Sequence, residues 1–186
     1  MLSVEHLKIS AKNGDIESIR KNMELIKDDE KLLHTLFNLA IRHSRVDIAK
    51  FLIDGQIDIN YRGKYGWTAL IRAVESSSFD IVELLVARGA LIGVEDKYGN
   101  TALNLASAEG RLDVVKLLVK NNVRINHVNK YGWTALMRAV DNRRADIAKY
   151  LIGCGADVRI KDKLNRTAAD IARNKSYFEL IGLVEF

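Results

Sequence analysis

The chain contains no proline, and its single cysteine is Cys154. A single cysteine excludes an internal disulfide, so we interpret Cys154 as a small, partly buried apolar residue, with a reactive thiol as the alternative. The sequence has no run of about 18 apolar residues, the length needed to span a bilayer. Its first residues lack the apolar core of an export signal. Composition therefore indicates a cytoplasmic protein without a membrane span.

Motifs of catalysis and of cofactor binding are also missing. There is no phosphate-binding glycine loop, no His-Glu-x-x-His motif and no nucleophile elbow. The four histidines, His6, His34, His43 and His127, are dispersed along the chain. We expect His34 to lie in a turn and no two histidines to share a metal ion. The sequence therefore predicts a protein that is not an enzyme, with no catalytic residues, no metal site and no cofactor.

The charge of the chain is positive but mixed. Twenty-nine basic residues exceed 24 acidic ones, which gives a net charge of +5 and an isoelectric point near 9.3. An excess of this sign attracts polyanions. However, acidic residues are spread among the basic ones, and there is no block of lysine and arginine. Nucleic acid or an acidic lipid surface is therefore an alternative partner rather than the main one.

One short phrase recurs along the chain at a fixed interval. It begins at threonines 33 residues apart: Thr35 (TLFNLA), Thr68 (TALIRA), Thr101 (TALNLA), Thr134 (TALMRA) and Thr167 (TAADIA). Four aspartates keep the same interval, each before an apolar stretch: Asp47, Asp80, Asp113 and Asp146. A fixed period of this length indicates a stack of similar supersecondary units rather than one globular core.

The phrase and its period resemble the ankyrin repeat, from about Ile9 to Phe186. The turn before each phrase supports the resemblance, because it reads KYGWT at 64–68, KYGNT at 97–101, KYGWT at 130–134 and KLNRT at 163–167. Two positions depart from the family signature. The family's proline is replaced by alanine at Ala69, Ala102, Ala135 and Ala168, and its histidine by Ile71, Asn104, Met137 and Asp170. The threonine–histidine hydrogen bond that is usual in the family therefore cannot form.

The resemblance implies an all-α ankyrin-repeat solenoid of helix-turn-helix units with β-hairpin-like finger loops. About six repeats are expected in a single domain, 1–186, with atypical units at both ends. The expected ranges are an N-terminal cap at 1–29, full repeats at 30–62, 63–95, 96–128 and 129–161, and a C-terminal cap at 162–186.

Local chemistry predicts the conformation within each unit. The same left-handed turn is expected at Gly66, Gly99, Gly132 and Asn165, followed by threonine as the helix N-cap. The aspartates should lie in the first turn of each second helix, and left-handed caps should end these helices at Gly89, Asn122 and Gly155. The turn near Gly55 should differ, because its glycine comes one position early. Buried triplets are expected at Ile81, Leu84 and Leu85, at Val114, Leu117 and Leu118, and at Ile147, Tyr150 and Leu151.

The finger loops, and the first helices one turn from their start, repeat side chains that suit protein recognition. Stacked units would align them as ladders: Lys64, Lys97, Lys130 and Lys163; Tyr65, Tyr98 and Tyr131; Trp67 and Trp133; and Arg72 and Arg138. Together with Asn100 these are our candidate partner-binding residues. The resemblance implies that they lie on the concave face and finger tips, where ankyrin domains usually bind partners. The alternative is that the copies record repeat duplication and that the tryptophans only contact the next finger.

These observations and the resemblance predict a non-catalytic protein-protein interaction module. The resemblance implies a role as an adaptor, an inhibitor or an effector-type scaffold, with delivery into a host cell as an effector as the alternative to a cytoplasmic location. Tryptophan, tyrosine and arginine contribute most to protein interfaces, and the lysines favour an acidic protein segment. Polyanion binding through the lysine ladder is the alternative function. A monomer is expected, with the apolar ending ELIGLVEF as a possible contact.

Overall fold

A computed structural model describes residues 3–185, apart from the side chain of Lys64. The chain divides into two compact units, which we describe separately. The first unit comprises the residues up to Gly63 together with Thr68–Ala90. The second comprises Lys64–Trp67 and the residues from Leu91 onward.

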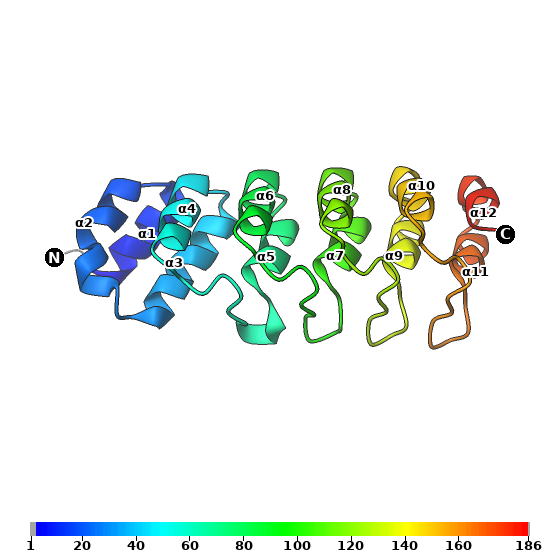
Figure 1. The fold of residues 1–186 in the computed structure, drawn as a ribbon, viewed down its shortest axis with the longest axis horizontal. Coiled ribbons are helices and arrows are strands. Elements are labelled where there is room, and N and C mark those ends of the chain that lie inside the picture. Colours follow the sequence, from blue (N-terminus) through cyan, green and yellow to red (C-terminus); the bar gives the residue numbers. More distant parts are fainter. Residues whose placement is uncertain (1–2, 186) are drawn as a thin grey trace. The chain divides into compact units, whose positions relative to one another are not determined.

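The first unit consists of three helix pairs: α1 (Val4–Asn13) with α2 (Ile16–Ile26), α3 (Glu30–Arg42) with α4 (Val46–Asp54), and α5 (Ala69–Glu75) with α6 (Phe79–Ala87). Helix α3 packs between α1 and α5, while α4 contacts both α2 and α6 (Figure 1). Fully buried aliphatic side chains such as Leu36, Ile48 and Leu52 fill the space between the two layers.

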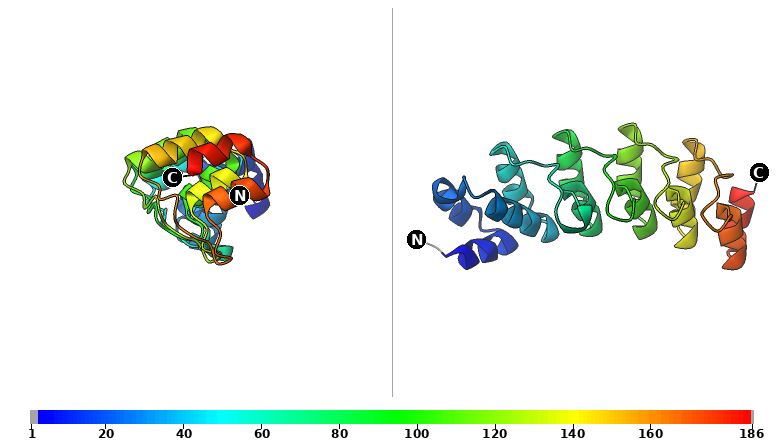
Figure 2. Two further views of the ribbon diagram at one scale, coloured as in Figure 1. Left: turned by 90° about the vertical axis from the view of Figure 1, so that its right-hand side faces the viewer. Right: turned by 90° about the horizontal axis from the view of Figure 1, so that it is seen from below.

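The second unit repeats the same arrangement. It contains a short 3-10 helix, η1 (Lys64–Gly66), and the pairs α7 (Ala102–Glu109) with α8 (Leu112–Lys120), α9 (Ala135–Asp141) with α10 (Ala145–Gly153), and α11 (Ala168–Asn174) with α12 (Phe178–Val184). Helix α9 contacts α7 and α11 in one layer, and α10 contacts α8 and α12 in the other. The loops before α7, α9 and α11 extend beyond the helices on the same side (Figures 1 and 2).

The expected all-α class is confirmed. Across residues 3–185 there are twelve α-helices and one 3-10 helix but no β-strand, and each of the six repeat ranges contains two α-helices. Short helices of this kind are stable because their apolar faces pack against neighbouring pairs. The repeat boundaries and the grouping of all residues into a single domain stay predictions.

Most of the helix ends follow the expected chemistry. The hydroxyl of Thr134 accepts the N–H of Met137 at 3.2 Å, and Thr68 and Thr167 cap α5 and α11 in the same way. The four recurring aspartates lie in the first turns of α4, α6, α8 and α10, where they stabilise the helix dipole. The left-handed conformation is present at Gly89, Asn122 and Gly155, as expected.

Helix α3 departs from the expected repeat. Its N-cap is Asp29, which accepts the N–H of Leu32 at 2.9 Å, so Thr35 lies inside the helix. The placement of His34 in a turn was also wrong: this histidine is buried in α3 and stacks on Tyr61 with ring centroids 4.0 Å apart. The cause is the segment before Thr35, which contains helix-forming residues where the other units have a glycine turn.

Two repeats hold the N-cap threonine through a residue other than histidine. Asn104 Oδ1 accepts both the N–H and the hydroxyl of Thr101, at 3.0 and 2.8 Å. Asp170 Oδ2 receives the same two bonds from Thr167, at 2.9 and 2.8 Å. A short amide or carboxylate at the replaced histidine position therefore fixes the threonine, which the sequence analysis did not foresee.

The turn near Gly55 keeps the common geometry, contrary to expectation. Gly55 has a φ of −76°, and the next residue, Gln56, takes the left-handed conformation with a φ of 65°. The following amide, Ile57 N–H, donates to the carbonyl of Leu52, as Ala90 N–H donates to Leu85 after α6. The stacking of the helices thus imposes the turn even where glycine is displaced by one position.

The three finger loops before α7, α9 and α11 are each closed at the base by a buried acidic or amide side chain. Asn129 Oδ1 accepts the N–H groups of Tyr131 and Trp133 at 2.9 and 3.0 Å. Asp96 and Asp162 make the equivalent bonds in the neighbouring fingers: Asp96 Oδ1 accepts from Tyr98 and Asn100, and Asp162 Oδ1 from Leu164 and Arg166. A backbone bond from the same residue to the end of the loop completes the closure.

Successive fingers of the second unit are joined by backbone hydrogen bonds at their tips. The N–H of Lys97 donates to Tyr65 C=O at 2.8 Å, and the equivalent bonds run from Lys130 to Tyr98 and from Lys163 to Tyr131, each at 3.0 Å. The expected positive φ is present at Gly66, Gly99, Gly132 and Asn165. The expectation of one identical turn was nevertheless wrong, because Tyr65 in η1 also has a positive φ of 71°.

The buried faces of the second helices are rotated relative to the expected triplets. Val115 and Leu118 are 0% exposed, whereas Leu117 is half-buried. In the same way, Val82 is fully buried in α6 where Leu84 was expected, and Ala148 is fully buried in α10 where Tyr150 was expected. The residue directly after the first buried position, rather than the one three positions later, faces the neighbouring helices.

We expect Leu118→Ala to lower the free energy of unfolding by about 2–5 kcal/mol, because it deletes a fully buried side chain. Leu117→Ala is the matched control and should cost less than about 2 kcal/mol, since its side chain is already partly in water. Urea denaturation followed by circular dichroism measures both values. Equal losses would contradict the burial observed in α8.

Gly132→Ala should destabilise the protein more than Gly155→Ala. Both glycines have a positive φ, of 80° and 92°, so alanine costs about 1–2 kcal/mol of backbone strain at either site. Only at Gly132 would the new Cβ also lie 2.9 Å from the Cα of Asp162 and from the backbone nitrogen of Lys163. Thermal unfolding of the two variants compares them, and similar midpoints would show that the fingers separate without cost.

Candidate functional site

The tips of the fingers in the second unit form a row of exposed apolar and aromatic side chains. Tyr65, Tyr98 and Tyr131 are 48%, 43% and 54% exposed, and Leu164 takes the fourth place at 71%. Lys97, Lys130 and Lys163 are exposed beside them. Because each tip is hydrogen-bonded to the next, this row has a defined backbone. We call the three tyrosines and the leucine the tip row.

Lys97 is held between two members of the tip row. Its ammonium nitrogen lies 4.1 Å from the ring centroid of Tyr65 and 4.6 Å from that of Tyr98. Such cation–π contacts are favourable even at exposed sites. A hydrogen bond with Tyr98 raises the pKa of Lys97 above its usual value. The lysine thus stabilises the positions of two tyrosine rings.

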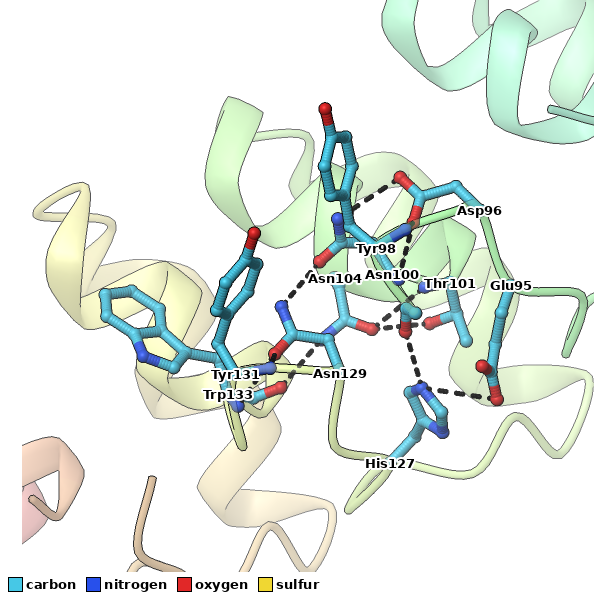
Figure 3. A network of polar contacts seen from close by, with 11 residues as sticks. Glu95, Asp96, Tyr98, Asn100, Thr101, Asn104, His127, Asn129, Tyr131 and Trp133 are labelled. Atoms are coloured by element: carbon cyan, nitrogen blue, oxygen red, sulfur yellow. Dashed lines mark hydrogen bonds and ion pairs between the residues drawn. The ribbon is translucent and has the colours of Figure 1, made fainter. Parts of the chain in front are cut away.

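Asn100 differs from the other candidate residues because its side chain is only 4% exposed. Its Oδ1 accepts from Asn129 Nδ2 at 2.8 Å, and its Nδ2 donates to Asp96 (Figure 3). The same Oδ1 also accepts from the guanidinium of Arg138 at 3.2 Å. The side chain therefore connects two fingers and orients Arg138. Little of it remains available to a partner.

The same network contains a residue that the motifs of the sequence did not single out. The Nε2 atom of His127 lies 2.8 Å from the carbonyl oxygen of Gly99 and 3.8 Å from a carboxylate oxygen of Glu95 (Figure 3). This contact braces the tip of the preceding finger. The neighbouring repeats have Val94 and Ile160 at this position, so no periodic signal could have revealed the contact.

Trp133 is half-buried between two arginines rather than placed freely on a finger. The guanidinium carbons of Arg138 and Arg166 lie 5.2 and 5.8 Å from the centre of its ring. Arg166 also donates from Nε and Nη2 to Asp162 Oδ2, at 2.9 and 2.7 Å. The result is a compact group of one indole, two guanidinium groups and one carboxylate, next to a hollow of about 390 Å³.

The remaining candidates are placed as follows. Trp67 is half-buried and belongs to the second unit, whereas Arg72 is half-buried in α5 of the first unit. Burial lowers the pKa of the Arg72 guanidinium. The side chain of Lys64 lies outside the described residues.

The bases of the fingers also carry a periodic signal in the sequence. Asp96, Asn129 and Asp162 lie 33 residues apart, with Gly63 at the preceding position. This period is the same one that marks the threonines. The signal is weaker than theirs, because the residue alternates between aspartate and asparagine and is replaced by glycine in one repeat.

Residues 3–185 contain no group of three or more metal-ligating side chains. Within the same residues, no helix is long and apolar enough to cross a membrane.

The Asp162 carboxylate gives a pH-dependent prediction. Burial raises its pKa, but hydrogen bonds from Arg166 and from two backbone N–H groups outweigh burial, so that the pKa is lowered overall. A carboxylate whose pKa is lowered in the folded state stabilises the protein at pH values above the unfolded-state pKa of about 3.9. This stabilisation is lost as the pH falls through the folded-state pKa. The Asp162→Asn variant, which has the same side chain as Asn129 in the preceding finger, should be less stable than the wild type at pH 7.

The thermal unfolding midpoints of the wild type and Asp162→Asn, measured from pH 7 downward, test this prediction. The difference should shrink below about pH 4 as the wild-type carboxylate is protonated. A difference that stays constant down to the acidic end would mean that the charge of Asp162 contributes nothing.

Comparison with known proteins agrees with this architecture. The family model for ankyrin repeats (3 copies) matches residues 7–96 and 88–162, which together cover most of the chain. A search of curated proteins gave no significant match. The paired helices and projecting fingers agree with this match, and the chain belongs to the ankyrin-repeat family.

Proposed function

We propose that this chain is a non-catalytic module that binds another protein through the finger loops of its second unit. The observation that carries the proposal is the tip row, three tyrosines and a leucine exposed on fingers that are hydrogen-bonded to one another. Aromatic side chains on a fixed backbone cover a large area at low entropic cost, which suits the centre of an interface. Ankyrin repeats generally mediate protein–protein interactions, and the family is typically non-catalytic.

The proposed contact surface extends from the tip row to the side chains beside it. It includes Lys97, Lys130, Lys163, Trp133 and Arg138, with Trp67, Arg72 and Lys64 retained as further candidates. Asn100 receives a positioning role, because its polar atoms are already bonded within the protein. The exposed lysines favour a partner segment that carries acidic residues, which would also speed association. The functional class, adaptor, inhibitor or effector-type scaffold, depends on that partner.

Polyanion binding has weaker support. Of the ladder lysines, Lys97 is already engaged by two tyrosine rings. The carboxylates of Asp96 and Asp162 lie directly before Lys97 and Lys163 and reduce the local positive charge. Nucleic acid is therefore retained only as an outcome of the experiment below.

The proposal is tested by affinity capture from a lysate of the source organism, with the partner then purified for titration. We expect Tyr98→Ala combined with Tyr131→Ala to weaken its binding by about 2 kcal/mol or more, because interface tyrosines are frequent hot spots. Phe178→Ala is the matched control: it removes an aromatic side chain that is 77% exposed at the start of α12, away from the fingers, and should leave the affinity unchanged.

Circular dichroism first establishes that both variants are folded. A partner that binds the tyrosine variant as tightly as the wild type would refute the role of the tip row. Captured material that disappears after nuclease treatment would instead support the polyanion alternative.

A further inference from the structure

The hollow beside Trp133 combines an apolar wall with an excess of positive charge. It lies in the second unit between two successive fingers and has a volume of about 390 Å³. Tyr131, Trp133 and Leu164 provide the apolar part of its lining. This volume is sufficient for one or two side chains of a partner but not for a folded element.

The charged part of the lining is not balanced. Arg138, Lys163 and Arg166 carry three positive charges, and Asp162 carries the one negative charge. Both oxygens of Asp162 are occupied, Oδ1 by two backbone N–H groups and Oδ2 by Arg166. The carboxylate therefore compensates Arg166 and leaves the other two cations uncompensated.

Arg138 and Lys163 have no carboxylate partner in the part of the chain that the structure describes. Within residues 3–185, neither forms an ion pair. One nitrogen of Arg138 donates to the neutral amide oxygen of Asn100, but its Nε atom is shielded from solvent and has no hydrogen-bond acceptor. A guanidinium that is partly removed from water without an anionic partner is costly to keep, and an entering carboxylate would relieve this cost.

We infer that the hollow binds a carboxylate adjacent to an apolar side chain, as in a partner segment in which aspartate or glutamate neighbours an aliphatic or aromatic residue. The carboxylate accepts hydrogen bonds from Lys163 and Arg138, and the apolar group packs on Trp133 and Leu164. Charge-assisted bonds of this kind are strong where water is partly excluded. The inference rests on the proposed function, for which it specifies the chemistry of the ligand.

Two small probes of the same shape separate charge from apolar packing. The first is 3-phenylpropanoate, and the second is its neutral amide, 3-phenylpropanamide. The chain has two tryptophans, Trp67 and Trp133, so its two indole N–H signals can be followed in ¹⁵N nuclear magnetic resonance spectra and assigned with Trp67→Phe and Trp133→Phe. We expect the acid to shift the Trp133 signal in a saturable way and the amide to bind about tenfold more weakly.

Lys163→Gln tests the proposed cation, with Lys149→Gln, an exposed lysine of α10 outside the proposed contact surface, as the matched control of equal charge. The first change should weaken binding of 3-phenylpropanoate about threefold or more, and the second should leave it within about twofold. Equal binding of acid and amide, or equal shifts of both indole signals, would overturn the inference. Tighter binding of uridine monophosphate than of 3-phenylpropanoate would overturn it in favour of a nucleotide ligand.

The two proposals fail in distinguishable ways. If the probes do not bind at Trp133 but the captured partner still depends on Tyr98 and Tyr131, the hollow is wrong and the tip row stands. If the probes bind but the partner binds the tyrosine variant as tightly as the wild type, the proposed function fails and the hollow remains a binding site for acidic ligands.

Discussion

The three fingers before α7, α9 and α11 depend on one kind of interaction, in which a buried oxygen at the base of the loop accepts two backbone N–H groups. Asp96, Asn129 and Asp162 each provide that oxygen. Without it, the amides of the turn would need water, and the tip would lose a fixed conformation. Because the tips are fixed, the carbonyl of one finger can receive the amide of the next, and the side chains on them keep a constant direction.

The finger that lacks this interaction shows what the base residue controls. Gly63 occupies the position of Asp96, Asn129 and Asp162 and has no side chain to accept the amides. Although KYGWT occurs both at 64–68 and at 130–134, the first copy forms a 3-10 helix with Tyr65 at a positive φ, while the second forms the closed loop. An identical phrase therefore takes two conformations, according to the residue that precedes it.

Equivalent positions in the repeats also have different chemical roles. Asn100, Trp133 and Arg166 are 33 residues apart. Asn100 bridges two fingers, Trp133 packs against guanidinium groups, and Arg166 neutralises Asp162. The combination places an indole beside uncompensated cations at the hollow. A repeat protein can thus vary one position per unit and change the local surface chemistry without altering the stack that supports it.

The sequence by itself determined the class of fold, the helix pairs, the threonine caps and the left-handed turns, because these depend on residues within one repeat and recur every 33 positions. It also indicated which residues stand on the fingers. Tertiary structure alone decided which of these side chains remain exposed. The side chain of Asn100 is buried and hydrogen-bonded to Asn129 and Arg138, and Leu118 rather than Leu117 is fully buried. Both outcomes depend on atoms of a neighbouring repeat, and the distance to those atoms is set by packing rather than by local sequence.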